Sequence, residues 1–107
     1  MQLVMATYRA ASRLPPSERR GLAEQLRRAS VSIPSNIAEG HARAHRKEFL
    51  HFLSIARAST KEVETQLLIA VRLGYLTPQD VATALAHCEE VSRMLHAMRR
   101  RLGAATP

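Results

Sequence analysis

The stretch that decides the fold is residues 81–102, VATALAHCEEVSRMLHAMRRRL. Its apolar side chains repeat every seven residues in two registers: Val81, Cys88, Leu95 and Leu102 in one, and Ala84, Val91 and Met98 in the other. A heptad kept over three repeats is typical of a helix that packs against other helices along one seam. We therefore expect a long helix over about 78–102 inside a helical bundle.

Residues that start or stop helices divide the rest of the chain into three further helices. Thr77 followed by proline is an N-cap signal, and Gly74 is expected to end the helix before it. Pro15 and the proline after it end the first helix, and Ser17 is expected to cap the second. The expected helices cover about 2–13, 18–40, 46–73 and 78–102 of a single domain, residues 1–107.

Pro34 lies inside the second apolar pattern and leaves two interpretations. The helix either stops near Ser32 and restarts with Pro34 in its first turn, or it kinks there and continues to about Glu39. The apolar spacing keeps its phase through the proline, which favours one helix kinked at Pro34, with Gly40 as its C′ residue. Because the connections are short, the expected fold class is all-α, an antiparallel up-and-down four-helix bundle.

The net charge of the chain is +7, and the excess of basic side chains favours an anionic partner such as RNA or DNA. A GC-rich genome is an alternative explanation for the preference for Arg over Lys, but it would not explain that excess. The single cysteine, Cys88, and the lack of a secretory leader favour a reduced thiol and a cytoplasmic location. No apolar run approaches the roughly 20 residues that a membrane span needs.

Two basic groups stand out along the sequence. One surrounds the second connection and the other lies on the last helix; they are Arg43, Arg46 and Lys47, and Arg93, Arg99, Arg100 and Arg101. In an up-and-down bundle the fourth helix ends near the connection between helices two and three, so both groups should share one end. They could bind nucleic-acid phosphates there, or the last arginines could instead complement a helix C-terminus.

Polar side chains interrupt the inner faces of the second and third helices. Glu62, Glu64 and Gln66 flank the buried-type position Val63, and Arg27 and Arg28 are the expected partners of the two carboxylates. A polar network that fixes helix register explains this pattern, and so does a subunit interface or a ligand surface.

Catalytic and metal patterns are weak. Arg46 and His51 have the Arg-x4-His spacing of some helical ribonucleases, with His as acid or base and Arg on phosphate. Glu48 and His51 form one Glu-x-x-His motif, whereas a di-iron bundle needs two and further Glu residues. We therefore expect no enzyme activity, metal or cofactor, and keep the ribonuclease as an alternative.

Four stretches resemble a known family. They are LRRASVSIPSNIAEG at 26–40 and EFLHFLSIARAS at 48–59, followed by EVETQL at 62–67 and RLGYL at 72–76. The chain resembles the four-helix-bundle proteins encoded in intervening sequences of bacterial 23S ribosomal RNA genes, to which the accessory variability protein of diversity-generating retroelements is related. The family motif carries over to Arg27, Arg28, Pro34, Asn36, Glu39, Gly40, Glu62, Glu64 and Gln66.

The resemblance implies a non-catalytic homo-oligomer, usually a ring-like homopentamer. It also implies that nucleic acid and a reverse transcriptase are possible partners, since the retroelement relative binds both through a basic surface. A protein–protein adaptor or structural oligomer is the alternative from the same resemblance. Family members usually have further residues before the position of Met1, so the first helix is expected to be short, which bears on the stability of the oligomer.

Overall fold

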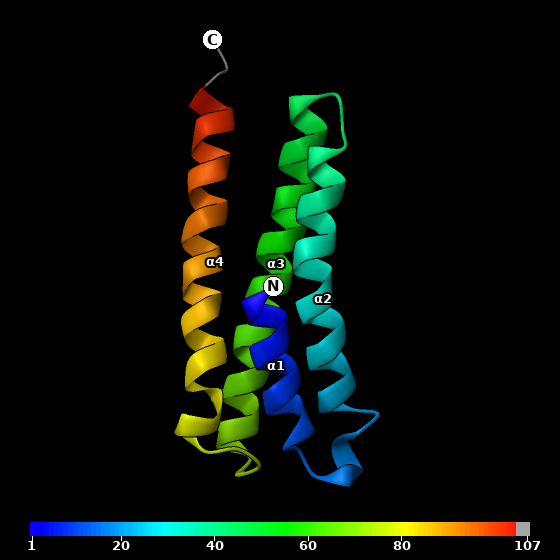
Figure 1. Cartoon of the computed structure of the whole chain (residues 1–107), viewed down its shortest axis with the longest axis vertical. Helices are drawn as coiled ribbons and strands as arrows, with labels where there is room; N and C mark the ends of the chain where they lie inside the picture. The colour runs from blue at the N-terminus through cyan, green and yellow to red at the C-terminus, as the bar shows by residue number, and fades with distance from the viewer. Residues whose placement is uncertain (105–107) are drawn as a thin grey trace.

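The computed structural model describes residues 1–104, which fold into four α-helices (Figure 1). They are α1 (Gln2–Ser12), α2 (Leu22–His41), α3 (Arg46–Arg72) and α4 (Pro78–Ala104), with a 3-10 turn η1 (Pro16–Glu18) before α2. Consecutive helices run in opposite directions (Figure 1), and residues 1–104 contain no strand. The expected all-α bundle is confirmed. No helix in this part of the chain is long and apolar enough to span a membrane.

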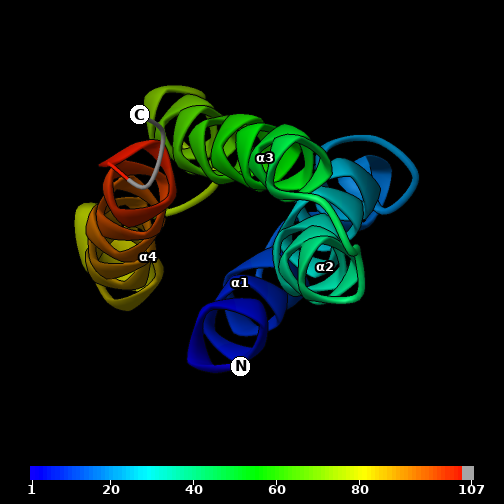
Figure 2. The ribbon, with the colours of Figure 1, turned by 90° about the horizontal axis from the view of Figure 1, so that it is seen from above.

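The helices occupy four corners around one core (Figure 2). α1 and α3 lie on opposite sides, and each packs against both α2 and α4. The fully buried side chains are mostly aliphatic and include Leu3, Leu26, Ile33, Leu67 and Leu95. Burial of each such side chain contributes about 2 kcal/mol, so aliphatic side chains supply most of the stability of this core.

The first helix covers only half of the bundle, because α1 has 11 residues and α4 has 27. In Figure 1 the chain starts about halfway along α4. Val81, Ala84 and Cys88, on the half of α4 beside α1, are at most 2% exposed. Met98 and Leu102, later in the same heptads, are only partly buried. Residues 1–104 therefore form a four-helix body at one end and a three-helix body at the other.

Pro34 sits inside a continuous α2, so the interpretation in which the helix stops near Ser32 is wrong. Proline has no N–H to donate to the carbonyl of Ser30, which loses its normal helical partner. The side chain of Asn36 donates from Nδ2 to the carbonyl of Ser32 over 2.7 Å and adds a bond in the same turn. The kink itself stays a prediction.

Two expected helix ends are wrong. Ser17 lies in η1, and α2 begins later, after Gly21, where the N–H of Leu22 donates to Glu18 Oε1 over 3.0 Å. The two prolines favour a separate tight turn, so a carboxylate four residues upstream caps the helix. Gly40 is not the C′ residue of α2 but a buried residue inside it, and its role is described below.

The other two expected ends are confirmed. Gly74 has φ 81° and ends α3, with hydrogen bonds from its own N–H to Val71 and from the Tyr75 N–H to Ala70. This is the Schellman arrangement, which favours glycine at the left-handed position. Thr77 caps α4 through its hydroxyl, which accepts from the N–H of Asp80 over 3.1 Å. The observed helix bounds otherwise differ from the expected ones by two residues or fewer.

Candidate nucleic-acid interface

The two basic groups meet at one end of the bundle. Arg46 is the first residue of α3, and its Nη1 donates over 3.3 Å to the carbonyl of Leu102 in the last turn of α4. The connection between α2 and α3 and the end of α4 lie at the same end of the bundle (Figure 1). We call the seven residues the basic end; they are Arg43, Arg46, Lys47, Arg93, Arg99, Arg100 and Arg101.

Within residues 1–104, two side chains of the basic end have carboxylate partners. Arg43 pairs with Glu39 at 2.9 Å and also lies 4.8 Å from the ring centre of Phe52, while Arg93 pairs with Glu89 at 2.8 Å. Among residues 1–104, the other five have no carboxylate within 4.0 Å. Exposed ion pairs contribute little, so the positive potential of this end is largely uncompensated.

The last arginines also lie where a helix dipole favours cations. Arg100 and Arg101 are exposed and Arg99 is half-buried, all in the final turns of α4. Within the described chain, the side chain that hydrogen-bonds a carbonyl of this end is Arg46 rather than any of these three. The side chains of Arg100 and Arg101 therefore remain available for an external anion.

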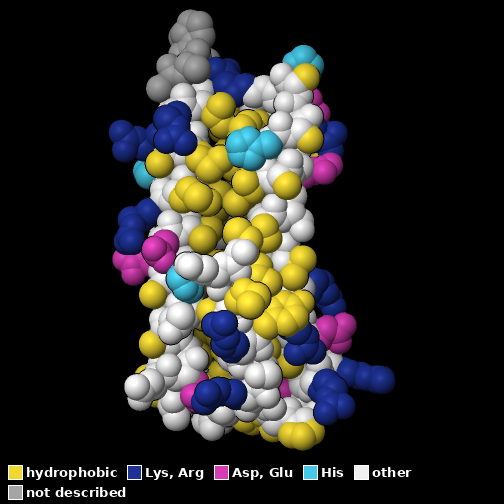
Figure 3. Space-filling model, in the orientation of Figure 1, with side chains coloured by type: hydrophobic (Ala, Val, Ile, Leu, Met, Phe, Trp, Pro, Cys, Tyr) yellow, Lys and Arg dark blue, Asp and Glu magenta, His cyan; other side chains and the backbone are white. Residues whose placement is uncertain are grey.

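Basic side chains also gather at the opposite end, which the sequence analysis did not predict (Figure 3). That end is formed by the end of α1, by η1 and by the start of α4, and it includes Arg9, Arg13, Arg19 and Arg20. Arg9 and Arg13 are four residues apart on one helix, a spacing that could have shown them as a group. All four arginines lie within residues 9–20, so the sequence analysis could have recognised them as a third basic group.

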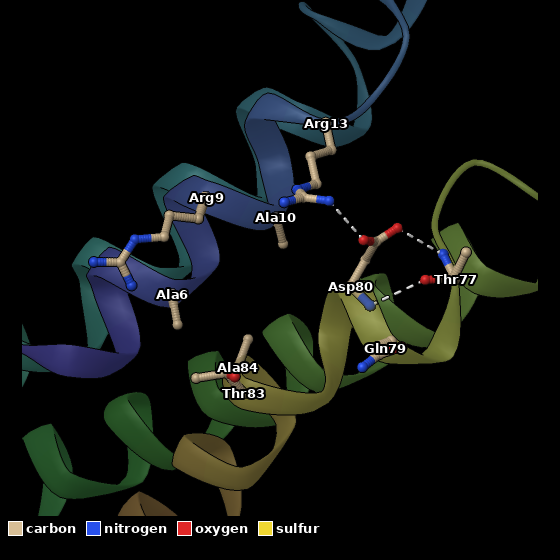
Figure 4. A pocket seen from close by; sticks show the side chains of 9 residues that line it. All are labelled: Ala6, Arg9, Ala10, Arg13, Thr77, Gln79, Asp80, Thr83 and Ala84. Carbon is tan, nitrogen blue, oxygen red and sulfur yellow. Dashed lines mark hydrogen bonds and ion pairs between the residues drawn. The ribbon is translucent and has the colours of Figure 1, made fainter.

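A groove of about 430 Å³ separates α1 from α4 at this opposite end, with Arg9 and Arg13 on its α1 side (Figure 4). Arg13 pairs with Asp80 at 2.9 Å, and Asp80 also accepts from the N–H of Thr77 at 2.9 Å. The Thr77 backbone bond lowers the pKa of Asp80, and the nearby guanidinium of Arg13 lowers it further. The Asp80 carboxylate thus already occupies the N-terminus of α4, where an external anion would otherwise bind.

The family motif forms the seam between α2 and α3. Ser32 Oγ and Ser59 Oγ lie 2.8 Å apart, and Asn36 donates to the same Ser32 oxygen over 2.9 Å. Gln66 is 7% exposed and its Nε2 donates to Gln25 Oε1 over 3.5 Å. These polar contacts join α2 to α3 at defined positions along their axes. They are the contacts that a network fixing the register of the two helices would make.

The expected ion pairs of this motif do not form. Arg28 pairs with Glu24, and Arg27 donates to the carbonyl of Arg19, while Glu64 lies 3.5 Å from Lys61. Val63 is fully buried, and its neighbours Glu62 and Glu64 leave the helix about 100° to either side, where both reach the surface. The prediction that these carboxylates are buried against Arg27 and Arg28 is therefore wrong.

Gly40 has a packing role in this motif. A Cβ at this position would lie 2.9 Å from Phe49 Cδ1 and 3.2 Å from Phe52 Cβ. Only a residue without a side chain allows α2 and α3 to approach this closely where the two helices meet at the basic end.

Comparisons with known proteins identify the family and the fold. The family model of the 23S rRNA-intervening sequence protein matches residues 1–97. The chain belongs to this family. A solved structure from Bacteroides thetaiotaomicron, a protein with unknown function from the S23 ribosomal protein family, is 22% identical and has a TM-score of 0.76. The match covers 90% of this chain and 87% of that one, and at this identity it shows a shared fold. A search of curated proteins gives no match.

In this member of the 23S rRNA-intervening sequence protein family, the Arg46–His51 pair has no shared site within one protomer. Arg46 is hydrogen-bonded to Leu102, and His51 stacks edge-on against Phe52 at 5.4 Å. Five residues along a helix rotate the side chain by about 140°, so the two point to different faces. Among residues 1–104, no three His, Cys, Asp or Glu side chains come together as metal ligands.

Proposed function

We propose that this chain is a non-catalytic, homo-oligomeric bundle that binds RNA or DNA backbones through the basic end, as an accessory to a larger assembly in the cytoplasm. The observation that carries the proposal is the contact between Arg46 and Leu102, which brings two basic groups 56 residues apart in sequence onto one surface. The family name, which refers to 23S rRNA, supports RNA as the first nucleic acid to test.

The chemistry of the basic end suits phosphate better than bases. Arginine offers a planar fork of donors that matches phosphate, and five of the seven cations are not paired with carboxylates of residues 1–104. The nearby Phe49 and Phe52 are half-buried and packed under His41 and Arg43, so they offer no open platform for base stacking. Binding should therefore be weakly specific for sequence and strongly dependent on salt.

The decisive experiment compares charge removal at the two ends. Arg100→Gln/Arg101→Gln removes two charges from the basic end, and Arg19→Gln/Arg20→Gln removes two from the opposite end; all four side chains are exposed. Fluorescence anisotropy with a labelled RNA duplex over a salt series should show the first variant about tenfold weaker, with the salt slope reduced by about two. The second variant should bind like the parent.

Equal losses in the two variants would contradict the assignment of the site, because diffuse charge would then explain binding. Binding of the parent that does not respond to salt would contradict the electrostatic mechanism itself.

Two exposed apolar surfaces support self-association. On α1, Met5 is 56% and Tyr8 43% exposed; on α3, Leu68 is 49% exposed, and Leu73, the C-cap of α3, is 58% exposed. Because α1 and α3 lie on opposite sides of the bundle (Figure 2), the face of one copy can pack on the other face of the next. Such head-to-tail contacts close into a ring when the rotation permits, and five copies is the number that we propose.

Single charges test this arrangement. Met5→Lys and Leu68→Lys should each reduce the parent oligomer to monomers in sedimentation velocity. An equimolar mixture of the two variants should form dimers, because the unchanged α3 face of one variant can pack on the unchanged α1 face of the other. Val31→Lys is the matched control, since Val31 is 41% exposed on α2. A monomeric parent, or variants that assemble like it, would contradict the proposal.

The same surfaces favour a protein–protein adaptor as the second candidate, with a reverse transcriptase among its possible partners. In that case Arg99→Glu/Arg100→Glu/Arg101→Glu would leave partner binding intact, whereas Leu68→Lys would remove it.

A further inference from the structure

One arginine of the basic end rests on an aromatic ring. The guanidinium carbon of Arg43 lies 4.8 Å from the centre of the Phe52 ring, and its Nη2 donates to Glu39 Oε1 over 2.9 Å. The Arg43 side chain is 38% exposed, whereas that of Arg93, which makes the same kind of pair with Glu89, is 66% exposed. The Phe52 ring accounts for this difference, because it covers one face of the guanidinium.

The close approach of α2 and α3 places Phe52 beneath Arg43. Gly40 lies three residues before Arg43, and a Cβ at this position would be 3.2 Å from Phe52 Cβ. His51 packs against an edge of the Phe52 ring, with 5.4 Å between the ring centroids and an angle of 70° between the planes. Phe52 is thus held on several sides. We call the group that supports the guanidinium, together with it, the Arg43 platform; it consists of Glu39, Arg43, His51 and Phe52.

The Arg43 platform lies where α2 meets α3. Glu39 belongs to the last turn of α2, Arg43 to the connection that follows, and Phe52 to the second turn of α3. α1 lies on a different side of α2 (Figure 2), so it contributes nothing to this platform. With one face of the guanidinium on Phe52, the exposed part of Arg43 includes the opposite face.

We propose that this outer face of Arg43 stacks on an unpaired base of single-stranded RNA, while the other cations of the basic end hold the neighbouring phosphates. The inference rests on the proposed function and adds the form of RNA that the basic end prefers. Guanidinium planes stack on unpaired bases as aromatic rings do, whereas the bases inside a duplex are already stacked on one another.

The supports of Arg43 suit it to this role. A guanidinium that is already held by Phe52 and Glu39 loses little freedom when a base covers it. The pair with Glu39 also offsets part of its charge, so Arg43 has less to offer a phosphate than Arg100 or Arg101. Stacking requires only the flat face of a base, and the preference for base sequence therefore stays weak.

Arg43→Lys is the decisive variant, because lysine keeps the charge but has no planar group. Arg93→Lys is the matched control. Arg93 also belongs to the basic end and pairs with a glutamate four residues earlier, but among residues 1–104 it is Arg43 that lies over an aromatic ring.

Three labelled RNA probes of equal length separate stacking from charge: a single strand without self-complementarity, a strand in which every base is replaced by an abasic site, and a duplex. Fluorescence anisotropy should show Arg43→Lys about tenfold weaker than the parent on the single strand and unchanged on the other two. The salt slope should stay the same, since the charge is kept. Arg93→Lys should bind all three like the parent.

Phe52→Leu is a second variant that changes no charge. It removes the ring beneath Arg43 and should also weaken binding of the single strand severalfold, with circular dichroism as the control for folding. Equal binding of the single strand by Arg43→Lys and Arg93→Lys would overturn the inference. An equal loss by Arg43→Lys on the single strand and the abasic strand would do so too.

The same measurements separate this inference from the proposed function. Salt-dependent binding that weakens in Arg100→Gln/Arg101→Gln but not in Arg43→Lys would leave the proposed function standing and remove the base-stacking role. A parent that binds none of the three probes would contradict both.

Discussion

Arg46 donates from Nη1 to the main-chain oxygen of Leu102, 3.3 Å away, and thereby joins the start of α3 to the last turn of α4. The bond satisfies one of the carbonyls that every helix leaves unpaired at its C-terminus. One of the proposed phosphate-binding side chains is therefore also part of the fold, while its neighbour Lys47 makes no hydrogen bond within residues 1–104.

Arg46→Gln and Lys47→Gln should therefore differ. Each removes one charge and should reduce the salt slope of RNA binding by about one. Only Arg46→Gln should also lower the free energy of unfolding, by about 0.5–1 kcal/mol, because it removes the bond to Leu102. Urea denaturation and anisotropy measure the two effects; equal unfolding curves for the two variants would show that the bond does not contribute.

Gly40→Ala should destabilise the bundle by roughly 1 kcal/mol, because the added Cβ meets Phe49 and Phe52 and this clash outweighs the gain in helix propensity. Gly103→Ala is the matched control, since nothing lies within 4 Å of its Cβ position. Thermal unfolding measures both. Phe49→Leu in the Gly40→Ala background should recover part of the loss, and its failure to do so would assign the cost to the backbone.

Asp80→Asn should lower the melting temperature at neutral pH, by roughly 2–4 °C, because it weakens the cap of α4 and the pair with Arg13. The pKa of Asp80 is lowered from 3.8 by folding, so its contribution is complete above the ordinary carboxyl range and is lost as the pH falls through the lowered value. The difference from the parent should thus disappear in acid. Glu89→Gln, which removes an exposed pair, should change little at either pH.

Cys88 should be unreactive in the folded protein. Burial, with a smaller contribution from the carboxylate of Glu64, raises the pKa of its thiol to about 11, so almost no thiolate exists at pH 8. A colour-forming disulfide reagent should label it only after urea unfolds the chain. Ala86→Cys in a Cys88→Ala background places a thiol at an exposed position of α4 and should react at once. Rapid labelling of the parent would mean that the core opens.

Sequence patterns predicted the features that local chemistry determines. The heptads of α4, the cap at Thr77 and the left-handed Gly74 each depend on residues within a few positions, and all three are confirmed. Gly40 shows where such reasoning fails. Its role depends on how closely α2 approaches Phe49 of α3. The residue pattern within one helix does not determine a distance between two helices.

The site was predictable to the extent that topology determines it. Knowing that helices alternate in direction was enough to bring the two basic groups together. The partners of Glu62 and Glu64 were not predictable, because the rotation of α3 about its axis decides whether these carboxylates face a neighbour or the solvent. The arginines near α1 and η1, by contrast, lie within residues 9–20 and could have been recognised from the sequence.

α1 lies beside only the first half of α4, and this has a consequence for amide hydrogen exchange along α4. Amide hydrogens of α4 beside α1 should exchange only when the whole bundle unfolds, whereas those after Val91 are packed by fewer helices and should exchange through local opening. Within residues 1–104, we thus expect α4 to be rigid beside α1 and softer toward the basic end. We therefore expect the basic end to adjust its shape to a ligand. Binding of RNA at that end should slow amide hydrogen exchange along the second half of α4.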